Sequence, residues 1–177
     1  MFALQTISPI EPAVRAQAPA GPVYCFVPAG GTDGARTQSR NAIRQLSEAM
    51  RACLAAEGDG RAYLLADFLD ETTSCIKCVD LNRSDPGQAR DAITAAEAVF
   101  VVCAGDHASI EDACAQAAWV QHVLGSVHRE EACGLLLLPV SGGLRAAEVE
   151  ESLGLPVCGM LKTDDQFAQL ARWIVQE

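Results

Sequence analysis

Basic residues are scarce in this chain. Thirteen Lys and Arg stand against 23 Asp and Glu, which gives a formal net charge of −10. Binding to a phosphate backbone needs clustered Lys and Arg, so this balance argues against a nucleic-acid partner. It argues equally against docking on an anionic membrane surface.

The sequence also lacks a long apolar run. No stretch approaches the ~20 apolar residues that cross a bilayer, so direct membrane insertion is not expected. Residues 1–22 have no basic start and no continuous apolar core, which argues against a signal peptide. The eight cysteines lie mostly in apolar runs or on helix faces. We therefore expect reduced thiols and a cytoplasmic location.

The length of 177 residues suits one compact domain. Residues 1–21 carry several prolines and no periodicity, which predicts an extended N-terminal tail. Residues 22–177 are predicted to form a single α/β domain. A chain of this size buries roughly 70% of its unfolded surface, so it needs no disulfide or metal to fold.

Short apolar runs alternate with stretches of helical periodicity. The runs are continuously apolar, which is typical of strands buried on both faces of a parallel sheet. The pattern predicts a mostly parallel sheet of about six or seven strands with helices on both faces. We expect Val23–Val27, Ala62–Ala66, Ala98–Ala104 and Ala132–Leu138 to be neighbouring parallel strands, with a weaker strand at Cys75–Leu81 and a short one at Val157–Leu161. Helices are expected over Arg36–Ala56, Pro86–Ala96, Ser109–Leu124, Arg145–Leu153 and Asp164–Val175.

A glycine-rich loop follows the first expected strand and precedes a helix. A turn of this kind can hold a phosphate, because backbone N–H groups and the helix N-terminus face the anion. The candidate cofactor-binding residues are Gly30, Gly31, Thr32, Asp33, Gly34, Ala35, Arg36 and Thr37. The loop has no Lys to add charge, and three glycines in five residues also suit a tight strand-to-helix turn.

The ordered set of motifs resembles the MinD/ParA-type ATPases, which carry a deviant Walker motif and the P-loop NTPase fold. The likeness is greatest to the CpaE-like branch, which serves pilus assembly. It rests on FVPAGGTDGART at 26–37, LLADF at 64–68, the strand at 95–104, CVDLN at 78–82 and LGLPVCGMLKTDD at 153–165. The resemblance covers residues 22–176 and implies a bacterial protein with this three-layer fold.

The chain departs from the family at the residues that carry charge. Gly30 stands where the family has its signature Lys, Ala35 where it has the phosphate-binding Lys, and Arg36 where it has the magnesium-binding hydroxyl. Asp67 and Asp80 match the family's metal- and water-ordering carboxylates and are the only candidate catalytic residues. The two carboxylates can equally cap the turns after their strands.

Other groups of residues give weaker evidence for a function. Cys75 and Cys78 form a lone C-x-x-C, whereas a zinc site needs four ligands, so no metal site is predicted. No Gly-flanked serine elbow supports a nucleophilic triad. Flavodoxin-like and deoxyribosyltransferase-like folds share the alternating pattern and compete at the level of fold.

The resemblance, together with these departures, implies a degenerate Walker A motif in a pseudo-ATPase. Its role would be protein–protein contact, in pilus assembly or polar localisation, with a second copy of the chain as one candidate partner. No cofactor is expected. The alternative is an active ATPase that uses Arg36, Asp67 and Asp80 with ATP or ADP and magnesium. A third alternative is a thiol or redox protein that uses Cys75 and Cys78.

Overall fold

The computed structural model describes residues 22–56, 65–66 and 76–176. The expected tail at 1–21, most of the expected strand at 62–66, Asp67 and Cys75 lie outside these residues. Elements follow in the order β1 (Tyr24–Pro28), α1 (Asp33–Ala56), β2 (Leu65–Ala66), β3 (Ile76–Cys78), α2 (Pro86–Ala95), β4 (Ala98–Ala104), α3 (His107–Gly125), η1 (Glu130–Ala132), β5 (Cys133–Leu138), α4 (Ala146–Leu153), β6 (Val157–Met160) and α5 (Asp164–Gln176).

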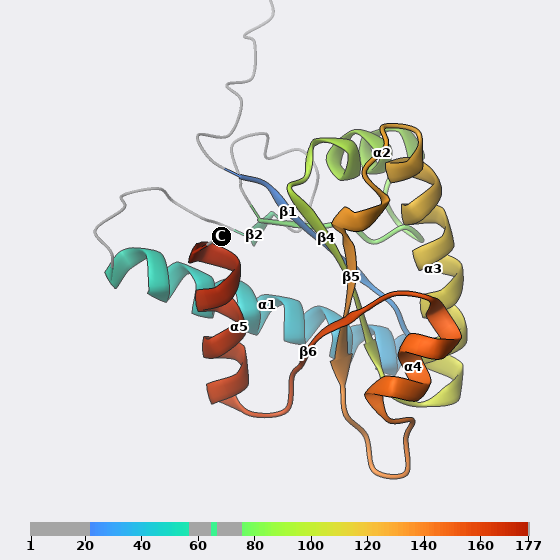
Figure 1. Cartoon of the computed structure of the whole chain (residues 1–177). Coiled ribbons are helices and arrows are strands. Elements are labelled where there is room, and N and C mark those ends of the chain that lie inside the picture. Colours follow the sequence, from blue (N-terminus) through green and yellow to red (C-terminus); the bar gives the residue numbers. More distant parts are fainter. Residues whose placement is uncertain (1–21, 57–64, 67–75, 177) are drawn as a thin grey trace, which may run out of the picture.

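The described strands form one parallel sheet between two layers of helices. Six strands are hydrogen-bonded in the order β2-β3-β1-β4-β5-β6, and every described pair is parallel. Helices α1 and α5 lie on one face of the sheet, and α2, α3 and α4 lie on the other (Figure 1). This arrangement confirms the α/β fold with a parallel sheet that the apolar runs predict.

Alternate residues of the central strands enter two separate cores. In β4, Val99, Val101 and Cys103 face α2, α3 and α4, whereas Phe100 and Val102 face α1 and α5. Both sets are buried because each face of the sheet is covered. The continuous apolar character of the run follows directly, since neither face of the strand meets water.

The order of the strands corrects one expectation. β2 does not neighbour β1, because the weaker strand β3 lies between them. Periodicity identifies a strand but carries no information about its neighbours in the sheet. The observed order also differs from the flavodoxin-like order, in which the second strand neighbours the first. The strand order of the described residues therefore does not fit that competitor.

Two helices of the second layer, α2 and α3, begin at a carboxylate N-cap. The Asp106 carboxylate accepts a hydrogen bond from the Ser109 N–H at 2.9 Å and caps α3. Asp85 caps α2 by accepting from the N–H groups of Gly87 and Gln88 at 2.9 and 3.1 Å. Burial raises the pKa of Asp106, but hydrogen bonds from Ser109 and nearby backbone amides outweigh that effect and lower it.

Among residues 22–56, 65–66 and 76–176, no helix has the length and apolar character needed to span a membrane.

Replacing Asp106 tests the cap of α3. We expect Asp106→Ala to lower the free energy of unfolding by about 1 kcal/mol, because one orphan helix donor loses its acceptor. The folded-state pKa is lowered, so the charge stabilises the protein above the unfolded pKa of about 3.9. The stability difference between the unmodified protein and Asp106→Asn should therefore disappear as the pH falls below about 4. Urea unfolding at several pH values measures both effects.

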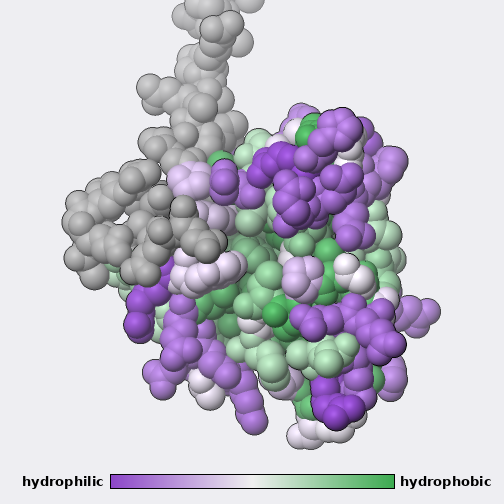
Figure 2. Space-filling view, viewed as in Figure 1, coloured by the Kyte–Doolittle hydropathy of each residue, from purple (hydrophilic) through white to green (hydrophobic). Residues whose placement is uncertain are grey.

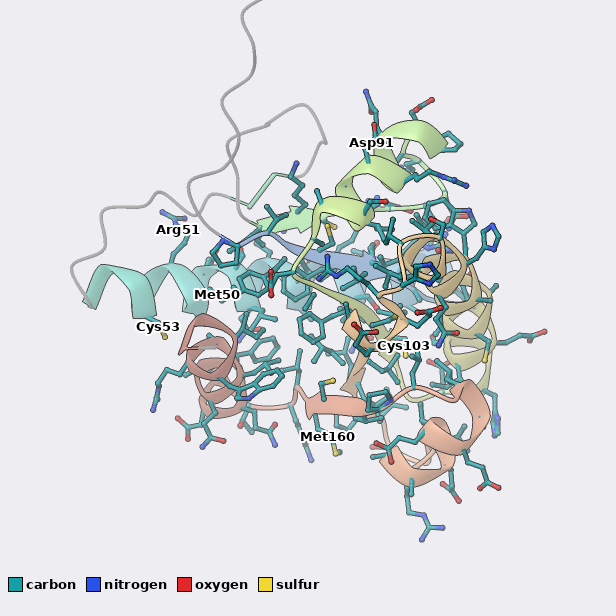
Figure 3. All side chains as sticks on the ribbon, turned by 45° about the horizontal axis from the view of Figure 1, so that its top comes forward. Met50, Arg51, Cys53, Asp91, Cys103 and Met160 are labelled. Atoms are coloured by element: carbon teal, nitrogen blue, oxygen red, sulfur yellow. The ribbon has the colours of Figure 1, made fainter. Side chains whose placement is uncertain are left out.

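Asp91 supplies the control. It is exposed on α2 and is labelled in Figure 3. Asp91→Ala should change the free energy of unfolding by less than about 0.5 kcal/mol. An equal loss in both alanine variants would mean that general charge, and not the cap, is responsible.

Candidate functional site

The candidate site lies where the chain changes direction across the sheet. β1 is followed by α1 on one face, and its neighbour β4 is followed by α3 on the other. In open parallel sheets a crevice forms between the carboxyl ends of two such strands, and ligands bind there. The glycine-rich loop after β1 therefore sits at the place where a nucleotide would bind in this class of fold.

The loop itself is shorter than the sequence indicates. α1 begins at Asp33, three residues before the expected start at Arg36, so the loop between β1 and α1 is 29–32. Thr32 is the N-cap of α1. Its Oγ1 accepts a hydrogen bond from the Ala35 N–H at 3.1 Å, and its carbonyl accepts one from the Arg36 N–H at 3.0 Å. Residues 33–37 of the predicted phosphate cradle are thus the first turn of α1.

The interior of this turn has no room for a side chain. A Cβ atom on Gly30 would lie 2.4 Å from the backbone nitrogen of Arg36 and 2.7 Å from the carbonyl carbon of Ala35. A Cβ atom on Gly31 would lie 2.5 Å from the Cβ of Ala108, at the start of α3. The loop after β1 is therefore in direct contact with the start of α3, and a Lys at position 30 would need the start of α1 to move.

A carboxylate of the protein binds one backbone amide of this loop and the nearby guanidinium. Asp112, on α3, accepts a hydrogen bond from the Gly30 N–H at 2.8 Å and from the Arg36 guanidinium at 3.1 Å. Arg36 also donates to the Gly30 carbonyl at 3.2 Å. The side chains of Arg36 and Asp112 are only 22% and 23% exposed. A backbone amide and a guanidinium are the groups that bind phosphate in other proteins, and here Asp112 engages both.

Asp80 is the one candidate catalytic carboxylate among the described residues. It follows β3, and its side chain is 8% exposed and paired with Arg40 of α1. It also accepts a hydrogen bond from the Asn82 N–H at 3.0 Å. Oriented with its oxygen toward Arg36, the Asn82 amide accepts from that guanidinium at 3.0 and 3.2 Å. Asp80 therefore both shapes the turn after its strand and neutralises Arg40.

The sequence reasoning missed two side chains of the candidate site. Arg40 lies one helical turn after Arg36, and this i,i+4 spacing is the signal that would have placed both guanidiniums on one face of α1. Asp112 has no local signal, because it reaches the loop from 82 residues away along the chain. The described site is thus a charge-balanced network of two arginines and two aspartates linked through Asn82.

The turn after β5 is held by backbone contacts. Gly142 has a φ of 72°, which a glycine adopts without strain. Gly143 packs against the backbone of Gly105, and the Leu144 N–H donates to the Gly105 carbonyl at 2.8 Å. These contacts are those of a plain turn.

The described cysteines are placed as the apolar runs predict. Burial raises the pKa of Cys25, Cys103 and Cys133 to about 12 each. Figure 3 shows Cys103 among packed interior side chains, with Cys53 near the C-terminal end of α1. Cys78 is buried in β3, and Cys75 lies outside the described residues, so the C-x-x-C stays untested. Across residues 22–56, 65–66 and 76–176, His, Cys, Asp and Glu nowhere gather in threes that could hold a metal ion.

Comparison with known proteins places the fold. No family model matches the chain, and no curated protein matches it by sequence. A chain of the MinC:MinD cell division protein complex of Aquifex aeolicus is similar in structure, with a TM-score of 0.56, 10% identity, and coverage of 88% of this chain and 96% of that one. The MinD cell division protein of the same organism gives a TM-score of 0.56 at 11% identity, covering 88% of this chain and 97% of that one.

A second kind of neighbour matches less of its own length. The rubredoxin oxygen:oxidoreductase of the anaerobe Desulfovibrio gigas gives a TM-score of 0.50 at 15% identity, covering 90% of this chain and 36% of that one. At these identities the comparisons show the fold alone. The fold is MinD-like, as the ordered motifs predict, and the match to MinD extends over nearly the whole of both chains.

The tight packing of the loop after β1 predicts opposite effects on stability when two of its glycines are replaced by alanine. Gly30→Ala should lower the free energy of unfolding by about 1–3 kcal/mol, because its Cβ meets backbone atoms that cannot rotate away. Gly34→Ala is the matched control, since its Cβ would meet only Thr32 Oγ1 at 3.8 Å. In the first turn of α1 it should raise stability by about 0.5–1 kcal/mol. Denaturant unfolding decides, and equal effects at both positions would contradict the closed loop.

The thiol assignments predict a labelling order. A pKa of about 12 instead of 9.0 lowers the thiolate fraction of Cys25, Cys103 and Cys133 about a thousandfold. Iodoacetamide should therefore label half-buried Cys53 and Cys114 first, as mass spectrometry of the peptides would show. In 6 M guanidinium all of these sites should label alike. Labelling of Cys25 as fast as Cys114 in the native protein would refute the assignment.

Proposed function

We propose that this chain is a non-catalytic relative of the MinD/ParA-type ATPases that acts through contacts with other proteins. The observation that carries the proposal is the Asp112 carboxylate bound to the Gly30 N–H and to Arg36. A loop whose amide and guanidinium already hold an internal anion has little to offer a nucleotide phosphate.

Charge supports the same conclusion. Phosphoryl transfer relies on cations that neutralise developing charge and on a bound magnesium ion. The described network pairs Arg36 with Asp112 and Arg40 with Asp80, so it carries no excess positive charge. Asp33 adds an exposed carboxylate to the same turn. Each missing charge-assisted hydrogen bond is worth roughly 1.5–3 kcal/mol, so two lost bonds weaken binding by about two to four orders of magnitude.

A structural neighbour supports a role in contacts with other proteins. One structural neighbour is a chain of the MinC:MinD complex, in which a protein of this fold is assembled with a partner. The motifs at 64–68, 78–82 and 153–165 resemble the pilus-assembly branch, so a role in pilus assembly or polar localisation is the finer form of the proposal. The net charge of −10 favours a partner with a basic surface.

The competing function is an ATPase that uses Arg36, Asp67 and Asp80. In that case Arg36 must leave Asp112 before it can bind a phosphate, and Asp80 must leave Arg40 before it can order a water or a metal ion. Both ion pairs are partly buried, so each separation leaves a charge that needs a new partner.

Calorimetry distinguishes the two functions. We expect at best weak binding of ATP or ADP by the unmodified protein in the presence of magnesium, and no measurable release of phosphate. The physical reason is the occupied loop and its balanced charge. Micromolar ATP binding that Asp67→Ala abolishes would establish the ATPase instead.

Asp112 can be tested against its neighbour in the chain. Asp112→Asn removes the charge that competes for Arg36 and Gly30, so inorganic pyrophosphate should gain measurable affinity for this variant. Glu111→Gln is the matched control, because Glu111 is exposed on the same helix and makes no contact with the loop that the structure records. A gain in both variants would mean that overall charge excludes the anion and that Asp112 has no special position.

A further inference from the structure

A pocket of about 390 Å³ borders the amino ends of the strands, at the opposite end of the sheet from the glycine-rich loop. Tyr24, Ala98 and Cys133 are the first residues of β1, β4 and β5, and all three line it. Trp173 and Ile174, near the end of α5, contribute to the lining from the covering layer of helices. The pocket therefore lies between α5 and the start of three neighbouring strands.

A second pocket, of about 410 Å³, continues along β6 and α5. Cys158 and Trp173 line both pockets, so the two form one elongated groove. Two large apolar side chains of this groove, Met160 and Trp173, are 43% and 44% exposed. Exposed apolar surface that is gathered in one place marks a site of contact with another molecule. The elongated shape suits a segment of polypeptide better than a compact small molecule.

The charge of the first pocket identifies the group that fits it. Glu97 and Glu131 belong to its lining, and both residues are exposed. Tyr24, Phe100 and Trp173 also line it, and the faces of aromatic rings attract cations. None of the described residues that line either pocket is Lys or Arg. A cationic group on an apolar stem therefore complements this end of the groove, whereas an anion would be repelled.

Arginine matches these walls better than lysine does. Its guanidinium is planar and weakly hydrated and stacks on aromatic rings, whereas the lysine ammonium is a strongly hydrated point charge. Trp, Tyr and Arg are also the residues that contribute most to binding at protein interfaces.

We propose that a partner protein binds this chain by placing an arginine in the pocket lined by Glu97, Glu131 and Trp173, with an adjacent apolar residue of the partner beside Met160. This inference rests on the proposed function, because it names the surface and the partner chemistry of the protein contact. The net charge of −10 favours the same choice over a second copy of this chain, since two copies would repel each other.

Titration of the ¹⁵N-labelled protein with N-acetyl-L-argininamide tests the pocket. The chain has two tryptophans, Trp119 and Trp173, so their indole N–H signals in NMR spectra report separately. We expect millimolar affinity, with a shift of the Trp173 signal and none of the Trp119 signal. N-acetyl-L-citrullinamide, which has the same shape but no charge, should bind about three- to tenfold more weakly. Equal affinities, or a shift of Trp119 in place of Trp173, would overturn the proposal.

Two neighbouring glutamates provide a matched pair of variants. Glu131→Gln should reduce the preference for argininamide over citrullinamide at least about twofold, because one carboxylate of the pocket is lost. Glu130→Gln changes the net charge equally, but Glu130 lies outside the lining and beside Gly125 of α3, so the preference should stay unchanged. An equal reduction in both variants would mean that overall charge attracts the probe, which would refute the pocket.

Removal of the indole ring is an independent test. Trp173→Ala should weaken the binding of argininamide about two- to fivefold, because the exposed ring no longer faces the guanidinium. Circular dichroism of the variant checks that its fold is intact. Unchanged affinity in the folded variant would contradict the role of Trp173.

Other occupants of the groove give different results. N-acetyl-Arg-Leu-amide should bind more tightly than N-acetyl-L-argininamide and should also shift the backbone amides of Gly159 and Met160, which line the second pocket. Tighter binding of agmatine, a free guanidinium compound, would make the groove a small-molecule site and overturn the proposal. A Trp173 shift that grows with protein concentration alone would assign the groove to a second copy of the chain and also overturn it.

The proposed function and this inference fail separately. Binding of ATP that shifts the amides of residues 30–37 would overturn the proposed function and leave the titration with argininamide unchanged. Absence of a Trp173 shift with argininamide would overturn the inference and leave the calorimetry with nucleotides unchanged.

Discussion

Burial of the central strands on both faces is the constraint on which the rest of the structure depends. β1, β4 and β5 are covered by α1 and α5 on one side and by α2, α3 and α4 on the other. Helices must then leave the strands alternately toward the two faces, and the loops that carry them meet at the carboxyl ends of the strands.

In other proteins of this architecture the meeting place is a crevice, but here it is packed. Gly31 packs against Ala108, and Asp112 joins α3 to the loop after β1 and to α1 by binding Gly30 and Arg36. The same helix that supplies Asp112 presents Gln116 and Trp119 one and two turns later. α3 therefore packs against the loop after β1 with one part of its length and lines a pocket beside α2 with another.

The exposed surface has separate hydrophobic and hydrophilic areas. Figure 2 shows hydrophobic residues in the middle of one face, bordered by hydrophilic residues over α2. Met160 at the end of β6 and Trp173 on α5 are 43% and 44% exposed, and Figure 3 shows Met160 pointing outward. The outer strand β6 is short, with four residues, which limits its pairing with other chains.

Much of the fold could be read from the sequence, because a strand buried on both faces leaves an unbroken apolar run. Ala98–Ala104 is predicted to the residue, and α2, α4 and α5 to within one residue at each end. The insertion of β3 between β2 and β1 could not be predicted, since strand order depends on contacts between distant segments. The glycine-rich loop lies directly after β1, as predicted, although residues 33–37 belong to α1. The hydrogen bond between Gly30 and Asp112 could not be predicted, because the two residues are far apart in the sequence.

The contact between Asp112 and Gly30 makes any anion in solution a competitor against a group held on the same chain. A tethered ligand acts at an effective concentration that is commonly on the order of millimolar, whatever the bulk solution contains. A phosphate that approaches the loop must displace Asp112 from Gly30. Its apparent dissociation constant is therefore raised by the ratio of loops with Asp112 bound to loops with Asp112 released. Dilution never removes this competitor, because the Asp112 carboxylate stays on the same chain as the loop.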